Sequence, residues 1–212
     1  MKKLVLVTLV VLLAGCQSAY YAAWEKVGVE KRDILVDRVQ DAKESQEDAQ
    51  QQFSSALDQF SQLINFDGGE LQDIYEQLQD QFEASEDSAA SVSGRIDKVK
   101  SVATALFDEW QQELEKYTNK TLKRDSQRKL KDTQRRYQSL LNAMRKAESK
   151  MDTVLLALRD NVLYLKHNLN ASAIGALQGE FNGIKKEIKQ LVSEMNHAIA
   201  ESSSFVASMK SQ

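Results

Sequence analysis

The chain has 212 residues, of which 42% are hydrophobic and 28% charged, and it contains no proline. Average usage of about 5% would give roughly ten prolines, so their absence favours long uninterrupted helices over sheets. The formal net charge of −3 argues against general nucleic-acid binding, which usually shows a strongly basic balance. The composition therefore predicts an all-α protein without a nucleic-acid partner.

The first residues are typical of an export signal. Lys2 and Lys3 precede an apolar run from Leu4 to Leu13, which is shorter than the roughly twenty residues that a membrane-spanning helix needs. Leu13-Ala14-Gly15-Cys16 resembles the lipobox of bacterial lipoproteins, in which the leader is cut before a cysteine that becomes acylated. We therefore expect residues 1–15 to be a lipoprotein signal peptide and Cys16 to be the lipidation site. An ordinary signal peptide with an incidental cysteine is the alternative.

The residues after Cys16 bear on its destination. Gln17 and Ser18 stand where an aspartate would retain an enterobacterial lipoprotein at the inner membrane. By that resemblance, we expect an outer-membrane lipid anchor with the protein facing the periplasm. Residues 16–24 form a membrane-proximal linker, whose candidate headgroup contacts are Tyr20, Tyr21 and Trp24. Packing of these rings at the base of the folded body is the alternative.

Apolar residues at alternating steps of four and three predict long helices at about residues 25–64, 70–117, 121–168 and 172–210. The pattern is clearest from Leu71 to Trp110, where only Ser85 interrupts it. Because the pattern keeps its phase through residues 85–94, the second helix is expected to be continuous. Thr121 and Ser172 are the expected N-caps of the last two helices.

Matching lengths and short turns favour an elongated antiparallel up-down-up-down four-helix bundle, or coiled coil, with a left-handed twist. A three-helix core with one helix free for a partner is the alternative. In the four-helix topology, the lipidated N-terminus, the turn near Asn119 and the C-terminus share the membrane-proximal end. The turns near Gly68 and Asn170 lie at the far end.

A basic cluster follows the turn near Asn119. Its candidate contacts with anionic headgroups are Lys123, Arg124, Arg128 and Lys131. A solvated face that pairs with neighbouring acids is the alternative. At the far end, the candidate contacts with a protein partner are Phe66, Lys166, His167 and Asn170. A solvent-exposed or turn-stabilising role is the alternative for this second group.

Two further patterns predict contacts between helices. The second helix carries a run of acids, which are Glu70, Asp73, Glu76, Asp80, Glu83, Glu86 and Asp87. They are expected to pair with Lys185, Lys186 and Lys189 of the last helix; a docking surface for a basic partner, or weak divalent-cation binding, is the alternative. Gly175, Gly179 and Gly183 recur every four residues and predict a close backbone approach, either within the bundle or at a self-association seam.

Little in the sequence suggests catalysis. It lacks a Walker loop, a dinucleotide-binding glycine fingerprint, a zinc-ligand pair and a nucleophile elbow. It has two histidines, His167 and His197, which are far apart, and Cys16 is its only cysteine. We expect no enzyme activity, no cofactor and no bound metal.

Three stretches resemble domain-of-unknown-function family 2959 of gammaproteobacterial envelopes. They are residues 25–36 (EKVGVEKRDILV), residues 105–110 (ALFDEW) and residues 162–171 (VLYLKHNLNA). The resemblance covers nearly the whole mature chain and implies a helical lipoprotein. It implies no activity and no functional residues.

The preferred hypothesis is an outer-membrane lipoprotein that acts as a non-catalytic spacer or adaptor, through helical contacts with another envelope protein. The alternative is a helical bundle that binds or shapes membranes through its basic cluster. The sequence leaves open the partner, the physiological process and whether the chain forms a homo-oligomer.

Overall fold

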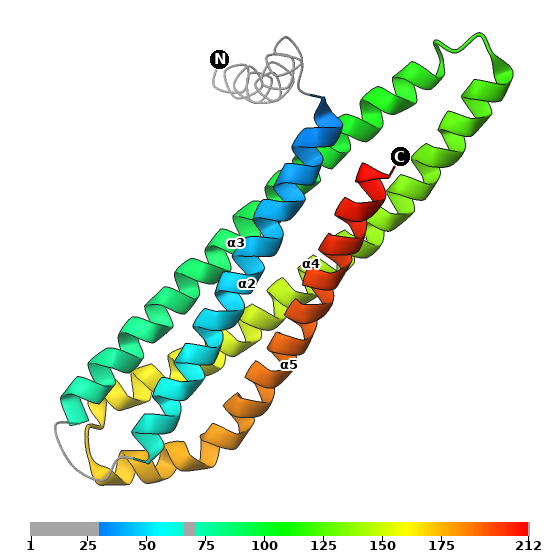
Figure 1. Ribbon diagram of the computed structural model, residues 1–212. Coiled ribbons are helices and arrows are strands. Elements are labelled where there is room, and N and C mark those ends of the chain that lie inside the picture. Colours follow the sequence, from blue (N-terminus) through cyan, green and yellow to red (C-terminus); the bar gives the residue numbers. More distant parts are fainter. Residues whose placement is uncertain (1–29, 66–70, 212) are drawn as a thin grey trace, which may run out of the picture.

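The computed structural model describes residues 30–65 and 71–211, which fold into four helices (Figure 1). They are α2 (Lys31–Ile64, 34 residues), α3 (Leu71–Leu114, 44 residues), α4 (Lys120–His167, 48 residues) and α5 (Ala171–Lys210, 40 residues). At a rise of 1.5 Å per residue the helices are about 50–70 Å long, so the molecule is a rod. The predicted residues that lie outside the described part of the chain are Cys16, Tyr20, Tyr21, Trp24 and Phe66, together with Gly68 of the predicted turn and Glu70 of the acidic run.

Successive helices run antiparallel, and each packs against two neighbours. The neighbouring pairs are α2 with α3, α3 with α4, α4 with α5, and α5 with α2. The predicted all-α four-helix bundle is therefore confirmed. The three-helix alternative is wrong, because α5 packs along both α2 and α4. As expected, the start of α2, the α3–α4 turn and the end of α5 lie toward one end of the rod (Figure 1).

The core consists of the apolar stripes that the sequence predicts. On α2, for example, Leu35, Phe53 and Phe60 are completely buried, and each such side chain contributes about 1.5–3 kcal/mol relative to exposure. The second predicted helix is continuous, since α3 extends without a break from Leu71 to Leu114. Ser85 is buried within it, and its hydroxyl donates a hydrogen bond of 2.7 Å to the Gln81 carbonyl. This bond satisfies the hydroxyl, so the apolar stripe continues past it.

Both predicted N-caps are wrong. The side chain of Asn119, not that of Thr121, accepts hydrogen bonds from the backbone N–H groups of Thr121 (2.9 Å) and Leu122 (3.2 Å). Likewise Asn170, not Ser172, accepts a bond of 3.1 Å from the backbone N–H of Ala173. In both turns an asparagine stands two residues before the predicted cap, and asparagine is among the best N-cap residues. The helices therefore begin slightly earlier than the sequence suggested.

The glycine repeat on α5 makes no close contact in the bundle. A Cβ atom added to Gly175, Gly179 or Gly183 would meet nothing within 4 Å. The predicted close backbone approach within the bundle is therefore wrong, because these residues lie on the exposed side of the helix. A self-association seam at these glycines stays a prediction.

The acids of α3 do not pair with the lysines of α5. These two helices are diagonal to each other in the bundle, so the core separates their outer faces. Among the described residues, no ion pair joins Asp73 or its acidic neighbours to Lys185, Lys186 or Lys189. Lys185 instead lies over the ring of Phe181, with its Nζ 5.7 Å from the ring centroid. The prediction of pairing within the chain is therefore wrong.

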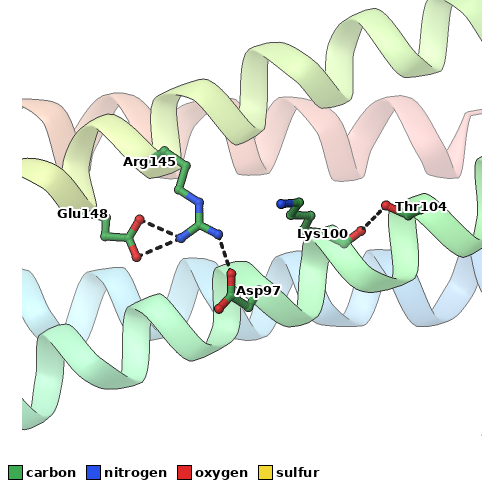
Figure 2. Close-up of polar contacts among 5 residues, drawn as sticks. All are labelled: Asp97, Lys100, Thr104, Arg145 and Glu148. Carbon is green, nitrogen blue, oxygen red and sulfur yellow. Dashed lines mark hydrogen bonds and ion pairs between the residues drawn. The ribbon is translucent and has the colours of Figure 1, made fainter. Parts of the chain in front are cut away.

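A polar contact ties α3 to α4 near the middle of the rod. Figure 2 shows Arg145 of α4 between Glu148 of its own helix and Asp97 of α3. Its Nη1 donates to the two carboxylate oxygens of Glu148 at 2.9 and 2.7 Å, and its Nη2 donates to Asp97. The Arg145 side chain is 36% exposed, and ion pairs this open to solvent contribute about 0–1 kcal/mol. The contact therefore specifies how α3 and α4 align more than it stabilises the bundle.

An aromatic layer joins three helices toward the end of the rod where α2 begins. The Tyr137 ring of α4 contacts Phe107 of α3 edge-on, with ring centroids 5.4 Å apart, and Phe205 of α5, with centroids 6.4 Å apart. Burial raises the pKa of the Tyr137 hydroxyl, and the charge of Arg145 offsets part of that rise. The phenol is therefore held in its neutral form above the pH at which a free tyrosine ionises.

We expect Tyr137 to make the protein less stable in alkali. Below a pH of about 10 the phenol is neutral in both the folded and the unfolded chain. As the pH rises through that value, the unfolded chain loses its proton first, so the free energy of unfolding falls until the folded pKa is reached. Urea denaturation at about pH 8 and about pH 11 should therefore show a smaller alkaline loss for Tyr137→Phe than for the wild type. Equal losses in the two proteins would contradict the assignment to Tyr137.

Candidate functional site

The α3–α4 hairpin projects beyond the other two helices at the end of the rod where α2 begins (Figure 1). Lys31, the first residue of α2, pairs with Glu109 of α3 at 3.2 Å. Trp110, the next residue of α3, donates through Nε1 to the Ser126 hydroxyl of α4 at 2.8 Å. Six residues, or about 9 Å of helix, separate Ser126 from the start of α4 at Lys120. The tip of the hairpin therefore lies roughly 10 Å past the start of α2.

The projecting hairpin has its own stabilising contacts. Leu114 and Leu130 are each 2% exposed and stand apart from the main apolar core. Lys123 pairs with Glu115 across the turn at 3.0 Å, and the Asn119 cap begins α4. Where α2 and α5 end against the hairpin, a recess of about 340 Å³ is lined in part by Trp110 and Met209. The hairpin is thus a folded projection of the rod.

The structure divides the predicted basic cluster into paired and unpaired cations. Lys123 pairs with Glu115, and Arg128 pairs with Asp125. Among the described residues, neither Arg124 nor Lys131 has an ion-pair partner. The alternative of pairing with neighbouring acids thus accounts for part of the cluster, and the remaining cations are exposed.

Sequence reasoning missed the apolar residues at the hairpin tip. Tyr117 is 41% exposed and Leu122 is 56% exposed, and they are flanked by the exposed cations Lys116 and Lys120, which have no ion-pair partner among the described residues. Leu122 lies off the stripe that leads to Leu130. The signal available in the sequence was the position of Leu122, an apolar residue that does not belong to the core stripe of its helix.

At the far end, Lys166 and His167 are exposed in the last turn of α4. There they lie near the partial negative charge of the helix terminus, where cations are favourable. Asn170 is also exposed, but its side chain caps α5. A turn-stabilising role therefore accounts for Asn170.

An apolar patch that the sequence reasoning did not identify lies beside these residues. Its members are 37–51% exposed: Leu156, Leu163, Tyr164 and Leu169. Leu169 lies in the turn, because α4 ends at His167. Leu156 and Leu163 are seven residues apart and share one face of α4, away from the buried stripe at Met151, Leu158 and Leu165. We call these four residues the distal patch.

The described residues offer no other obvious site. Within 30–65 and 71–211, no three histidine, aspartate or glutamate side chains gather where they could hold a metal ion. In the same part of the chain, no helix combines the length and the apolar character needed to cross a membrane. The candidate sites are therefore the hairpin tip and the distal patch.

Comparison with curated proteins and with solved structures finds no match. The family model described as "Protein of unknown function (DUF2959)" matches residues 20–209. This match includes all three of the stretches on which the sequence resemblance rests. The chain belongs to this family.

Proposed function

We propose that the protein is an outer-membrane lipoprotein, anchored through acylated Cys16 and facing the periplasm, that acts as a non-catalytic spacer or adaptor. The observation that carries this proposal is the difference between the two ends of the rod. The start of α2, which follows Cys16 by about fourteen residues, lies at one end. The distal patch lies on the last turns of α4, toward the other end.

The dimensions of the rod suit a spacer. The 34 residues of α2 and the 48 residues of α4 correspond to about 50 and 70 Å of helix. Four antiparallel helices around one apolar core resist bending more than a single helix does. The rod would therefore hold the distal patch several tens of Å from the membrane surface.

The distal patch is suited to a transient partner. Covering the exposed half of four large apolar side chains would contribute about 3–5 kcal/mol, given 1.5–3 kcal/mol for a fully exposed one. Association also costs translational and rotational freedom. Tight binding would thus need further contacts, for which the exposed Lys166 and His167 are available.

The alternative, a bundle that binds or shapes membranes lengthwise, has less support. It needs cations along one face, whereas the unpaired cations of the predicted cluster gather toward the hairpin end of α4. That position favours a contact at one end of the rod.

Photo-crosslinking in intact cells tests the adaptor proposal. A photoreactive residue at Leu163 or Asn170 should capture one defined envelope protein, and Leu156→Gln should reduce that capture. Gln127 in the hairpin and Gln138, an exposed residue on the middle of α4, are the control positions. Capture of the same proteins from all four positions, or of none from Leu163 and Asn170, would contradict the adaptor function.

A further inference from the structure

We propose that the tip of the α3–α4 hairpin is a second contact with the membrane, made to the anionic lipid surface that also holds the acyl anchor. The tip consists of Lys116, Tyr117, Lys120, Leu122 and Arg124. This inference rests on the lipid anchor of the proposed function. It adds a second contact point, which would fix how the rod stands on the membrane.

Position supports this contact. The tip extends roughly 10 Å past the start of α2 (Figure 1). Cys16 precedes Glu30 by fourteen residues, and covalent geometry lets such a length span up to about 46–50 Å. The anchor therefore leaves ample chain for the hairpin to reach the surface. Of the four described helices, α3 and α4 project farthest in this direction.

The chemistry of the tip matches the edge of a bilayer. Tyr117 and Leu122 expose 41% and 56% of their surface, and a tyrosine ring suits the headgroup level. Lys116, Lys120 and Arg124 are exposed and have no ion-pair partner among the described residues. Of the acids close by, Glu115 pairs with Lys123 and Asp125 pairs with Arg128 and Lys129, whereas Glu113 has no ion-pair partner among the described residues. The tip thus presents two exposed apolar side chains together with three exposed cations, which outnumber the one nearby acid that has no ion-pair partner among the described residues.

The size of each electrostatic contribution shows which cations would contribute to membrane binding. A basic residue close to an anionic membrane contributes about fivefold in occupancy, and this contribution fades within a Debye length of about 8 Å. Lys116, Lys120 and Arg124 lie within about one helical turn of the α3–α4 turn. Lys131 is eleven residues into α4, or about 16 Å along the helix from Lys120, so its contribution is small.

The tether makes a weak contact effective. Three cations and two half-exposed apolar side chains would hold a free protein only loosely. Once Cys16 is anchored, binding of the tip is an intramolecular step with a high effective concentration. The tip would therefore add little to membrane retention, and would mainly restrict the tilt of the rod and the direction of the distal patch.

The test uses the acylated full chain in vesicles of phosphatidylethanolamine and phosphatidylglycerol. Cys16 is the only cysteine and is acylated in the proposed protein, so Leu122→Cys supplies the only free thiol for an environment-sensitive fluorophore. Leu156→Cys, at 51% exposure in the distal patch, is the matched control. We expect blue-shifted emission and quenching by spin-labelled lipids at position 122, and neither at position 156.

A charge variant separates lipid binding from simple proximity. Replacing Lys116, Lys120 and Arg124 together by glutamine should lower the equilibrium constant for insertion at position 122 by about two orders of magnitude at low salt. The same replacement of Lys185, Lys186 and Lys189 should leave it unchanged. Zwitterionic vesicles should reproduce the effect of the first replacement.

The outcomes distinguish this inference from the proposed function. Mass spectrometry that finds no acyl groups on Cys16 would contradict the anchor, and this inference with it. Acylated protein that floats with the vesicles, but whose fluorophore at position 122 behaves like that at 156, would overturn the hairpin contact alone. Quenching at position 122 that changes neither with lipid charge nor with the glutamine replacements would also overturn the hairpin contact.

Discussion

Cys16→Ser, combined with exchange of residues 1–15 for an ordinary cleavable signal peptide, should release the protein into the soluble periplasmic fraction. Each buried methylene of an acyl chain contributes about 0.8 kcal/mol to membrane binding, and several chains hold a protein almost irreversibly. The remaining contacts, from the hairpin tip and the rings of Tyr20, Tyr21 and Trp24, are weak without the tether. Fractionation and immunoblotting should show loss of nearly all membrane-bound protein.

The leader must be exchanged in the same variant, because an uncleaved apolar segment would itself hold the chain at the inner membrane. The matched control carries the same foreign leader, but with the lipobox and Cys16 restored. Full membrane retention of the serine variant would contradict the anchor and favour the membrane-binding alternative, in which the helical body provides the affinity.

The fold was predictable because many residues report on the same structural feature. Every step of four or three between Leu71 and Trp110 places an apolar side chain on one stripe, so a single exception such as Ser85 does not change the conclusion. The lack of proline and the short turns then leave an antiparallel bundle as the simplest way to cover the stripes. By contrast, each helix boundary depended on one or two residues, and the choice of Thr121 over Asn119 was wrong.

The candidate sites were harder to predict because they depend on which side chains have neighbours. The acids of α3 and the lysines of α5 are complementary in charge, but only the packing order shows that the two helices are diagonal. From the sequence alone, Leu122 and Leu156 look like further apolar residues of the helix. Their exposure becomes clear only when the buried face of α4 is known. Nothing in the described contacts explains the three glycines of α5.

Gln46 lies in the apolar core of α2 and should weaken the bundle. It follows the predicted stripe, seven residues after Val39 and seven before Phe53, and is completely buried. Neither its Nε2 nor its Oε1 has a hydrogen-bond partner. The preceding residue, Ser45, lies 3.2 Å from Ser91 of α3, measured between hydroxyl oxygens, so Gln46 is level with the middle of α3. An uncompensated amide there costs about 1–3 kcal/mol for each unpaired group.

Gln46→Leu should therefore raise the free energy of unfolding by about 2–4 kcal/mol, since the new side chain has similar volume and no polar group to desolvate. Urea denaturation followed by circular dichroism measures the change. Gln51→Leu, at an exposed position on the same helix, should change stability by less than about 0.5 kcal/mol. Loss of stability in the Gln46 variant alone would mean that the amide is satisfied in solution. Equal gains in both variants would instead point to helix propensity, because leucine and glutamine differ in every helical position by the same small amount.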